Sequence, residues 1–204
     1  MKKVIFLSYP SDSASDPNPA FSYELTFNEE IVSIKKAIEY MEKNFFGKKT
    51  KIINELLSQV SLSSIIPLEN VLGNEDASFI KQAASRIYSG HHMLSKQKWP
   101  HIKLIKTAKN EWVLFEGHRT MLAYMAAGKR ILGEVPYLYV FHDDRDYMRD
   151  SEIMEFFSKL ARQIRNEDWR HYSLVWKARD YRQLCTRKYW SMEELFESLR
   201  NFIY

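Results

Sequence analysis

Apolar positions along the chain recur either in alternation or at helical spacing, and they predict a series of short elements. An apolar run at 4–7 predicts a buried first strand, and the polar stretch at 8–19 has the composition of a loop. Between 28 and 60, apolar residues recur at helical spacing with a break at Gly47, which is typical of amphipathic helices. Residues 1–60 are therefore expected to form an N-terminal strand, loop and helical extension.

The middle of the chain, residues 61–141, follows a different pattern. Ile66 precedes Pro67 and is therefore disfavoured in a helix, which indicates a short extended segment. Further along, two stretches alternate as strands should, and a turn at 108–110 makes them a hairpin. The expected elements are an extended segment, a helix ending at Gly90, the two hairpin strands, a second helix and a closing strand, at 65–68, 77–89, 101–106, 111–115, 117–127 and 135–141.

Residues 142–204 are expected to form a mostly helical region rich in aromatic and basic side chains. Apolar residues from 153 to 164 make one helical face. Ser191, with Glu194 in the third position after it, makes a capping box at the start of a last helix. The three parts together predict an α+β fold, in which a small mixed β-sheet in the middle carries flanking N- and C-terminal helices.

Composition narrows the class of protein. Of the 204 residues, 45% are apolar and 27% are charged, which suits one globular domain with an extension. No apolar run approaches the roughly 18 residues that span a bilayer, so we expect a cytoplasmic protein without a membrane partner. Cys185 is the single cysteine, which excludes an internal disulfide framework and a Cys-rich metal site. Its setting favours a half-buried structural thiol over a nucleophile.

Charge and aromatic content leave the partner open. The net charge of +4 permits a polyanionic partner without demanding one. Aromatic and basic side chains interleave in the C-terminal region, where they could stack nucleic-acid bases, shape a substrate pocket over a nucleotide, or simply form a solvated helical face around an aromatic core. The basic residues concerned are Arg162, Arg165, Arg170, Lys177, Arg179, Arg182, Arg187 and Lys188.

Candidate chemistry lies where the second hairpin strand passes into the following helix. The first N–H groups of a helix lack internal partners and carry partial positive charge, so they attract anions. Gly117 would allow a phosphate to approach closely, and Arg119 could grip its oxygens with two hydrogen bonds. His118 could add a donor or a proton, and Thr120 a hydroxyl. The alternative is a solvated helix start at which Arg119 pairs with a surface acid.

Glu116, at the end of the same strand, has two interpretations. Beside a phosphate site, its carboxylate would hold a divalent cation or accept a proton from a hydroxyl. Otherwise it forms a salt bridge with Arg119 or is an ordinary acid at a helix start.

The block from 65 to 141 resembles the ParB/sulfiredoxin superfamily. The resemblance covers a little over a third of the chain and rests on the order of "IPLENVLGNED", "IYSG", "PHIKLI", "EWVLFEGHRT", "MLAYMAAGK" and "VPYLYV". ParB partition proteins, sulfiredoxins and free serine kinases carry a short box at the start of the second helix that binds nucleotide phosphates. The resemblance therefore implies a small mixed sheet of the ParB/sulfiredoxin type and a nucleotide site at 117–120.

The box at 116–120 differs from that of each branch, and it is most similar to the box of the free serine kinases. Gly117 stands where sulfiredoxins have their cysteine, and the ParB box is matched only at Gly117 and Arg119. The free serine kinase box, Asp-Gly-His-His-Arg, is matched best, with Glu116 in place of Asp, followed by Gly117 and His118, while its final Arg is displaced. That branch also has a catalytic Glu after the first short strand, for which Glu75 is the match and Glu69 the alternative.

The resemblance implies a phosphotransferase or nucleotide hydrolase that uses ATP or ADP with Mg²⁺ and acts on a small hydroxyl substrate. Phosphoryl transfer needs a cationic cradle, a metal and a base. In this interpretation 117–120 supply the cradle, Glu116 contacts the metal, and Glu75 is the base. One alternative is a ParB-like DNA-binding protein or nuclease of plasmid or phage biology, although no clear helix-turn-helix follows 141. A third is a protein-interaction domain without turnover.

Overall fold

The computed structural model describes residues 3–10, 20–26, 59–70, 74–93, 100–142, 145–164, 167–178 and 181–203. In this part of the chain, helices and mixed sheets combine in an α+β fold, as the sequence predicts. The strands are β1 Lys3–Pro10, β2 Ala20–Thr26, β3 Ile66–Pro67, β4 Glu69–Asn70, β5 Ile102–Lys106, β6 Trp112–Glu116, β7 Tyr137–His142, β8 Tyr172–Ala178 and β9 Tyr181–Thr186. The helices are α2 Asn74–Tyr88, α3 His118–Ala126, α4 Asp150–Ile153 and α5 Met192–Ile203, with short 3₁₀ turns η2 Leu62–Ser64, η3 Leu132–Glu134 and η5 Trp169–His171 and a longer one, η4 Met154–Ile164.

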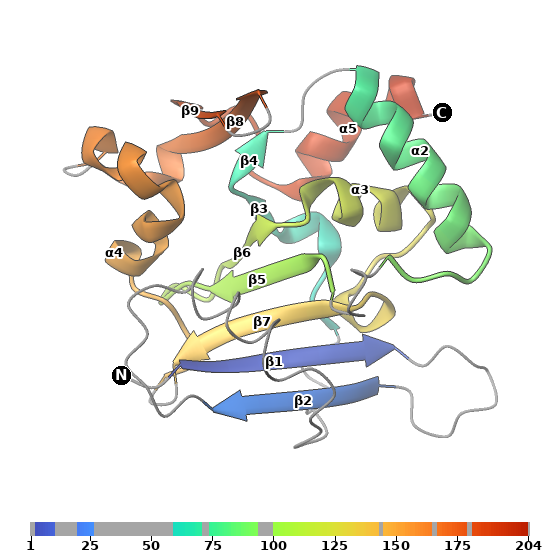
Figure 1. The fold of residues 1–204 in the computed structure, drawn as a ribbon, viewed down its shortest axis with the longest axis horizontal. Helices are drawn as coiled ribbons and strands as arrows, with labels where there is room; N and C mark the ends of the chain where they lie inside the picture. The colour runs from blue at the N-terminus through green and yellow to red at the C-terminus, as the bar shows by residue number, and fades with distance from the viewer. Residues whose placement is uncertain are drawn as a thin grey trace.

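The main sheet has the strand order β2-β1-β7-β5-β6-β3 and mixes parallel with antiparallel pairs. Strand β1 lies between β2 and β7 and is antiparallel to both, as Figure 1 shows. The apolar run at 4–7 is therefore an inner strand of the same sheet that carries the hairpin. The helices expected between 28 and 58 lie outside the described residues.

A second, three-stranded sheet has the order β4-β8-β9, and Leu68 connects it to the main sheet. The backbone N–H of Leu68 donates to the carbonyl of Leu114 in β6, and its own carbonyl accepts from the N–H of Leu174 in β8. Because Leu68 separates β3 from β4, a single buried residue passes the chain from one sheet to the other. The C-terminal hairpin thereby lies beside β4 (Figure 1).

Both faces of the central strands are buried. In β5, Leu104 belongs to the apolar cluster under α2, α3 and α5, whereas the next residue, Ile105, belongs to a cluster with η4 and Trp169. Alternate side chains of a strand point to opposite faces, so the two clusters lie on opposite sides of the sheet. Among the described residues, none of the helices has the length and apolar character that crossing a membrane requires.

The C-terminal region differs from its predicted helical character. Residues 172–178 and 181–186, expected to be helical with the rest of the region, form the hairpin β8–β9, and the apolar face at 153–164 lies mostly in the 3₁₀ helix η4. The last helix begins as expected, because Ser191 Oγ accepts a hydrogen bond of 3.2 Å from the N–H of Glu194. The region is thus part strand and part helix rather than mostly helical.

Candidate functional site at the start of helix α3

The junction between β6 and α3 turns on Gly117, which caps the helix in the left-handed region, at φ 87° and ψ 24°. Only glycine adopts this conformation without strain. A Cβ atom at Gly117 would stand 2.4 Å from the carbonyl oxygen of His101. The close approach that glycine permits here is made by the backbone that leads into β5, which holds the helix start against the sheet.

Arg119 lies in the first turn of α3 and is held by α2. Its Nη1 is 3.2 Å from Oδ1 of Asp76, and its guanidinium lies 5.6 Å from the centre of the Phe79 ring. The Arg119 side chain is nevertheless 56% exposed. Arg119 thus pairs with an acid, as the alternative interpretation expects, but it keeps enough exposure to reach an anion.

His118 is buried instead of facing solvent, with 4% of its surface exposed. Its Nε2 accepts a hydrogen bond of 3.1 Å from the backbone N–H of Glu69 in β4, which requires the lone pair on Nε2 and the proton on Nδ1. That Nδ1 lies 3.6 Å from Oε2 of Glu69 and has no hydrogen-bond partner. His118 therefore joins α3 to the second sheet.

The charges of three arginines also influence this imidazole. Burial lowers the pKa of His118 to about 3; the carbonyl of Leu114 opposes the shift, and the charges of Arg182, Arg187 and Arg119 add to it. These cations come from β9, from the segment after it and from α3. Of these arginines, Arg182 and Arg119 are paired with Glu69 and Asp76, and all three add positive charge near the helix start.

Arg187 is a fixed part of that field. It is 5% exposed, and it donates to the carbonyls of Pro67, Arg170 and Tyr172. Burial lowers the pKa of Arg187 to about 10, so it stays charged at neutral pH. The donors of Arg187 are used by backbone carbonyls. Arg119 and Arg182 are instead held by carboxylates, which an anion could replace.

Glu116 pairs with a cation from the neighbouring strand. Nζ of Lys103 lies 2.7 Å from Oε2 of Glu116, and the Lys103 side chain is only 10% exposed. Among the described residues, no group of three or more His, Cys, Asp or Glu side chains is placed to hold a metal ion. A carboxylate already matched by an ammonium group does not fit a resident Mg²⁺ site.

The remaining predicted residues are only partly brought together. Thr120 follows Arg119 in the first turn of α3 and is buried, with 6% exposed. Glu75 is the second residue of α2, next to Asp76, and its side chain lies outside the described part. The pair between Asp76 and Arg119 places the start of α2 beside the start of α3, so Glu75 and Arg119 belong to neighbouring turns.

Sequence reasoning missed the roles of Lys103, Asp76 and Arg182. Lys103 reads as the polar side of an alternating strand, yet it is buried against Glu116. Arg182 appeared only as one of many C-terminal basic residues, whereas its Nη2 lies 2.9 Å from Oε1 of Glu69. One local feature of the sequence could have indicated these partners, namely the acid-rich stretch from Glu69 to Asp76. In the structure Glu69 pairs with Arg182, and Asp76 pairs with Arg119.

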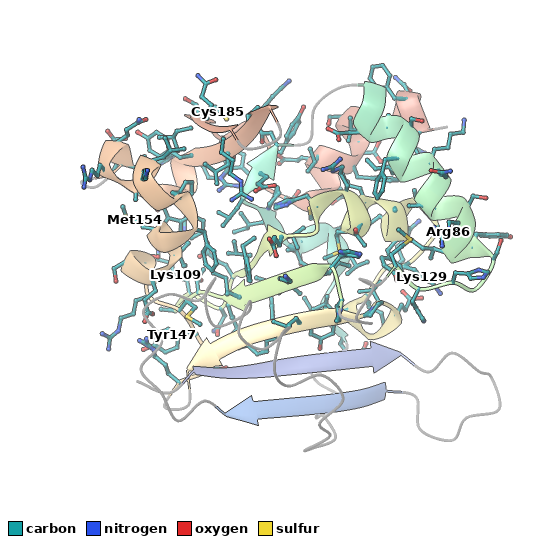
Figure 2. The ribbon with its side chains drawn as sticks, viewed as in Figure 1. Arg86, Lys109, Lys129, Tyr147, Met154 and Cys185 are labelled. Carbon is teal, nitrogen blue, oxygen red and sulfur yellow. The ribbon has the colours of Figure 1, made fainter. Side chains whose placement is uncertain are left out.

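Cys185 matches the expected half-buried structural thiol. Its Sγ donates to the carbonyl of Ser173 at 3.4 Å and lies 3.5 Å from Nδ2 of Asn70. Figure 2 shows it on the β8–β9 hairpin, at the other side of the molecule from Arg86 near the end of α2. Arg179, in the same basic region, lies outside the described residues.

No family model, no curated protein and no solved structure matches the chain.

Proposed function

We propose that the protein binds a nucleotide, ATP or ADP, with its phosphates at the start of α3. The observation that carries this proposal is that two guanidinium groups lie at the start of α3. Arg119 belongs to its first turn, and Arg182 is held by Glu69, which also contacts the buried His118. Anions bind where unpaired helix N–H groups and guanidinium groups face the same point. In this proposal Arg119 is the residue that binds the phosphate oxygens, because its side chain is 56% exposed.

The resemblance to the ParB/sulfiredoxin superfamily supports the nucleotide rather than another anion. In this proposal the main sheet and the β6–α3 junction are of that family's type, and the nearest branch is that of the free serine kinases. The activity is transfer of a phosphoryl group to a small hydroxyl substrate, or hydrolysis of the nucleotide.

In this proposal each residue at the start of α3 has its own role. Arg119 and the first amides of α3 bind and orient phosphate oxygens, and Arg187 supplies a fixed positive field. His118 is neutral and buried, so its part is to hold the helix start against β4 rather than to carry a proton. Glu75 is the proposed base for the accepting hydroxyl, since it lies one residue before the partner of Arg119. Mg²⁺ would enter with the phosphates, and no protein ligand is assigned to it.

Isothermal titration with ATP and with ADP, each with and without Mg²⁺, tests the proposal. Saturable binding by the wild type is expected, with affinity lowered about tenfold or more in Arg119→Ala because a charged hydrogen-bond pair is lost. Arg200→Ala is the matched control: Arg200 also pairs with an acid at 3.1 Å and is 61% exposed, but it lies on α5. Equal binding by Arg119→Ala and Arg200→Ala would remove the basis of the proposal.

A further inference from the structure

We propose that Arg182, on the C-terminal hairpin, is the second ligand-binding guanidinium of the α3 site, and that the site takes a ligand with two or more linked phosphates. This inference rests on the proposed function and extends it to a residue outside the resembling block. It makes the β4-β8-β9 sheet part of the binding site rather than a neighbouring structural unit.

The first observation is a parallel between two ion pairs. Arg119 pairs with Asp76 at 3.2 Å, and Arg182 pairs with Glu69 at 2.9 Å. Both carboxylates come from the one segment that runs from β4 into α2, while the two guanidinium groups come from α3 and β9. One stretch of chain thus supplies an acid to each of the two cations.

The second observation is that both cations lie close to the same buried imidazole. Arg119 is the next residue to His118, and Glu69, which holds Arg182 at 2.9 Å, lies 3.6 Å from Nδ1 of His118. The imidazole Nδ1 is buried and lacks a hydrogen-bond partner, and it faces the Glu69 carboxylate that holds Arg182. Glu69 thus links the buried imidazole to Arg182, which places Arg182 near the first turn of α3.

The two ion pairs differ in how readily an anionic ligand can replace the carboxylate in each. The Arg119 pair is open to solvent, with side chains 56% and 21% exposed, whereas those of the Arg182 pair are 23% and 12% exposed. Solvent-exposed pairs contribute little, whereas separating a more buried pair costs more, because it leaves a buried charge without its partner. A ligand therefore replaces the Asp76 carboxylate on Arg119 first. It replaces the Glu69 carboxylate on Arg182 only if a second anionic group reaches that far.

The class of ligand follows from this arrangement. The two guanidinium groups come from different elements and are held by different acids, so a ligand that takes both must place anionic oxygens at two positions, as linked phosphates do. A nucleoside monophosphate has one phosphate group, which would bind the guanidinium of Arg119 and leave Arg182 paired with Glu69. ATP, ADP and inorganic tripolyphosphate offer two or more and satisfy both.

The test is titration of AMP, ADP, ATP and inorganic tripolyphosphate into the wild type, Arg182→Gln, Glu69→Gln and the Arg200→Ala control. Arg182→Gln is expected to weaken ATP and tripolyphosphate by about tenfold and AMP by less than about twofold. Glu69→Gln frees Arg182 from its competing carboxylate and is expected to tighten ATP by about threefold or more. Circular dichroism and thermal unfolding of each variant confirm that the comparison is made on folded protein.

The outcomes separate this inference from the proposed function. If the wild type binds ATP but Arg182→Gln loses ATP and AMP affinity equally, or loses neither, Arg182 is not a ligand-binding residue. A Glu69→Gln variant that folds and binds ATP more weakly than the wild type also overturns the inference, because a purely structural pair gives that result. If tripolyphosphate binds through Arg182 and ATP does not bind, the inference stands and the nucleotide proposal falls. If neither ATP nor tripolyphosphate binds the wild type, both fall.

Discussion

The imidazole of His118 accepts a hydrogen bond of 3.1 Å from the backbone N–H of Glu69, which links the first residue of α3 to the second sheet. The bond uses the lone pair of a neutral imidazole, and protonation of Nε2 would break it. The buried ring also lies near three arginine charges, with Glu69 as the acid in contact. The fold therefore depends on His118 staying neutral.

This dependence predicts a loss of stability in mild acid. Burial lowers the pKa of His118 to about 3, below its unfolded value of 6.5, so between these values the unfolded chain binds more protons than the folded one. Stability is then complete above pH 6.5 and falls as the pH drops toward 3, by up to about 1.4 kcal/mol per pH unit. Urea unfolding at a series of pH values measures this slope.

The control for the acid effect is His118→Gln, which removes the titrating ring, compared with His91→Gln at an exposed position. The His118 variant is expected to be less stable at pH 7 but to lose less stability on acidification. The His91 variant should keep the wild-type slope. Identical slopes for all three proteins would show that another group governs the acid sensitivity.

Asp76→Asn is expected to tighten nucleotide binding. The Asp76 carboxylate holds Arg119 at 3.2 Å and must release it when a phosphate binds. A half-exposed pair of this kind is worth about 0.5–1 kcal/mol, so its loss should raise affinity about two- to fivefold. Titration with ADP measures the change, and Glu197→Gln, which removes the partner of Arg200, is the control. Weaker binding by Asp76→Asn would mean that the carboxylate orients Arg119 rather than competes with the ligand.

Gly117→Ala is expected to cost about 3 kcal/mol or more in the free energy of unfolding, because it combines a strained positive φ with overlap between Cβ and backbone. The new Cβ would stand 2.4 Å from the His101 oxygen. Gly128→Ala separates the two causes, since Gly128 has the same φ of +87° but no atom within 4 Å of the added Cβ. That control should lose about 1 kcal/mol. Similar losses in both variants, by urea unfolding, would show that the contact with His101 is unimportant.

Elements with one strong local pattern were predictable from the sequence. The strands β5, β6 and β7 and the helices α2, α3 and α5 all lie close to their predicted ranges, whereas β1 runs on to Pro10, so that residues 8–10, predicted to lie in a loop, belong to the strand. The β8 strand escaped prediction because Ser173, Leu174 and Val175 are all buried, which removes the alternation that identifies a strand with one solvent-facing side. Strand β2 and the hairpin partner β9 likewise depend on pairing with distant segments rather than on local pattern.

The site could be predicted only in part, for a related reason. Its location at the β6–α3 junction follows from local sequence, since a glycine and a basic residue stand at a helix start. The partners do not: Asp76, Glu69 and Lys103 reach the junction through tertiary packing and sheet register. The burial of His118 also comes from β4, which no local pattern connects to α3.

The central claim is that phosphates bind at the first turn of α3, and amide NMR tests it most directly. On titration with ADP, the backbone N–H signals of Arg119 and Thr120 are expected to move downfield and saturate, while adenosine leaves them unchanged because it lacks phosphate. Signals of α5, such as that of Arg200, should stay in place. Saturable ADP binding with unmoved Arg119 and Thr120 amides, or equal shifts with adenosine, would contradict the account.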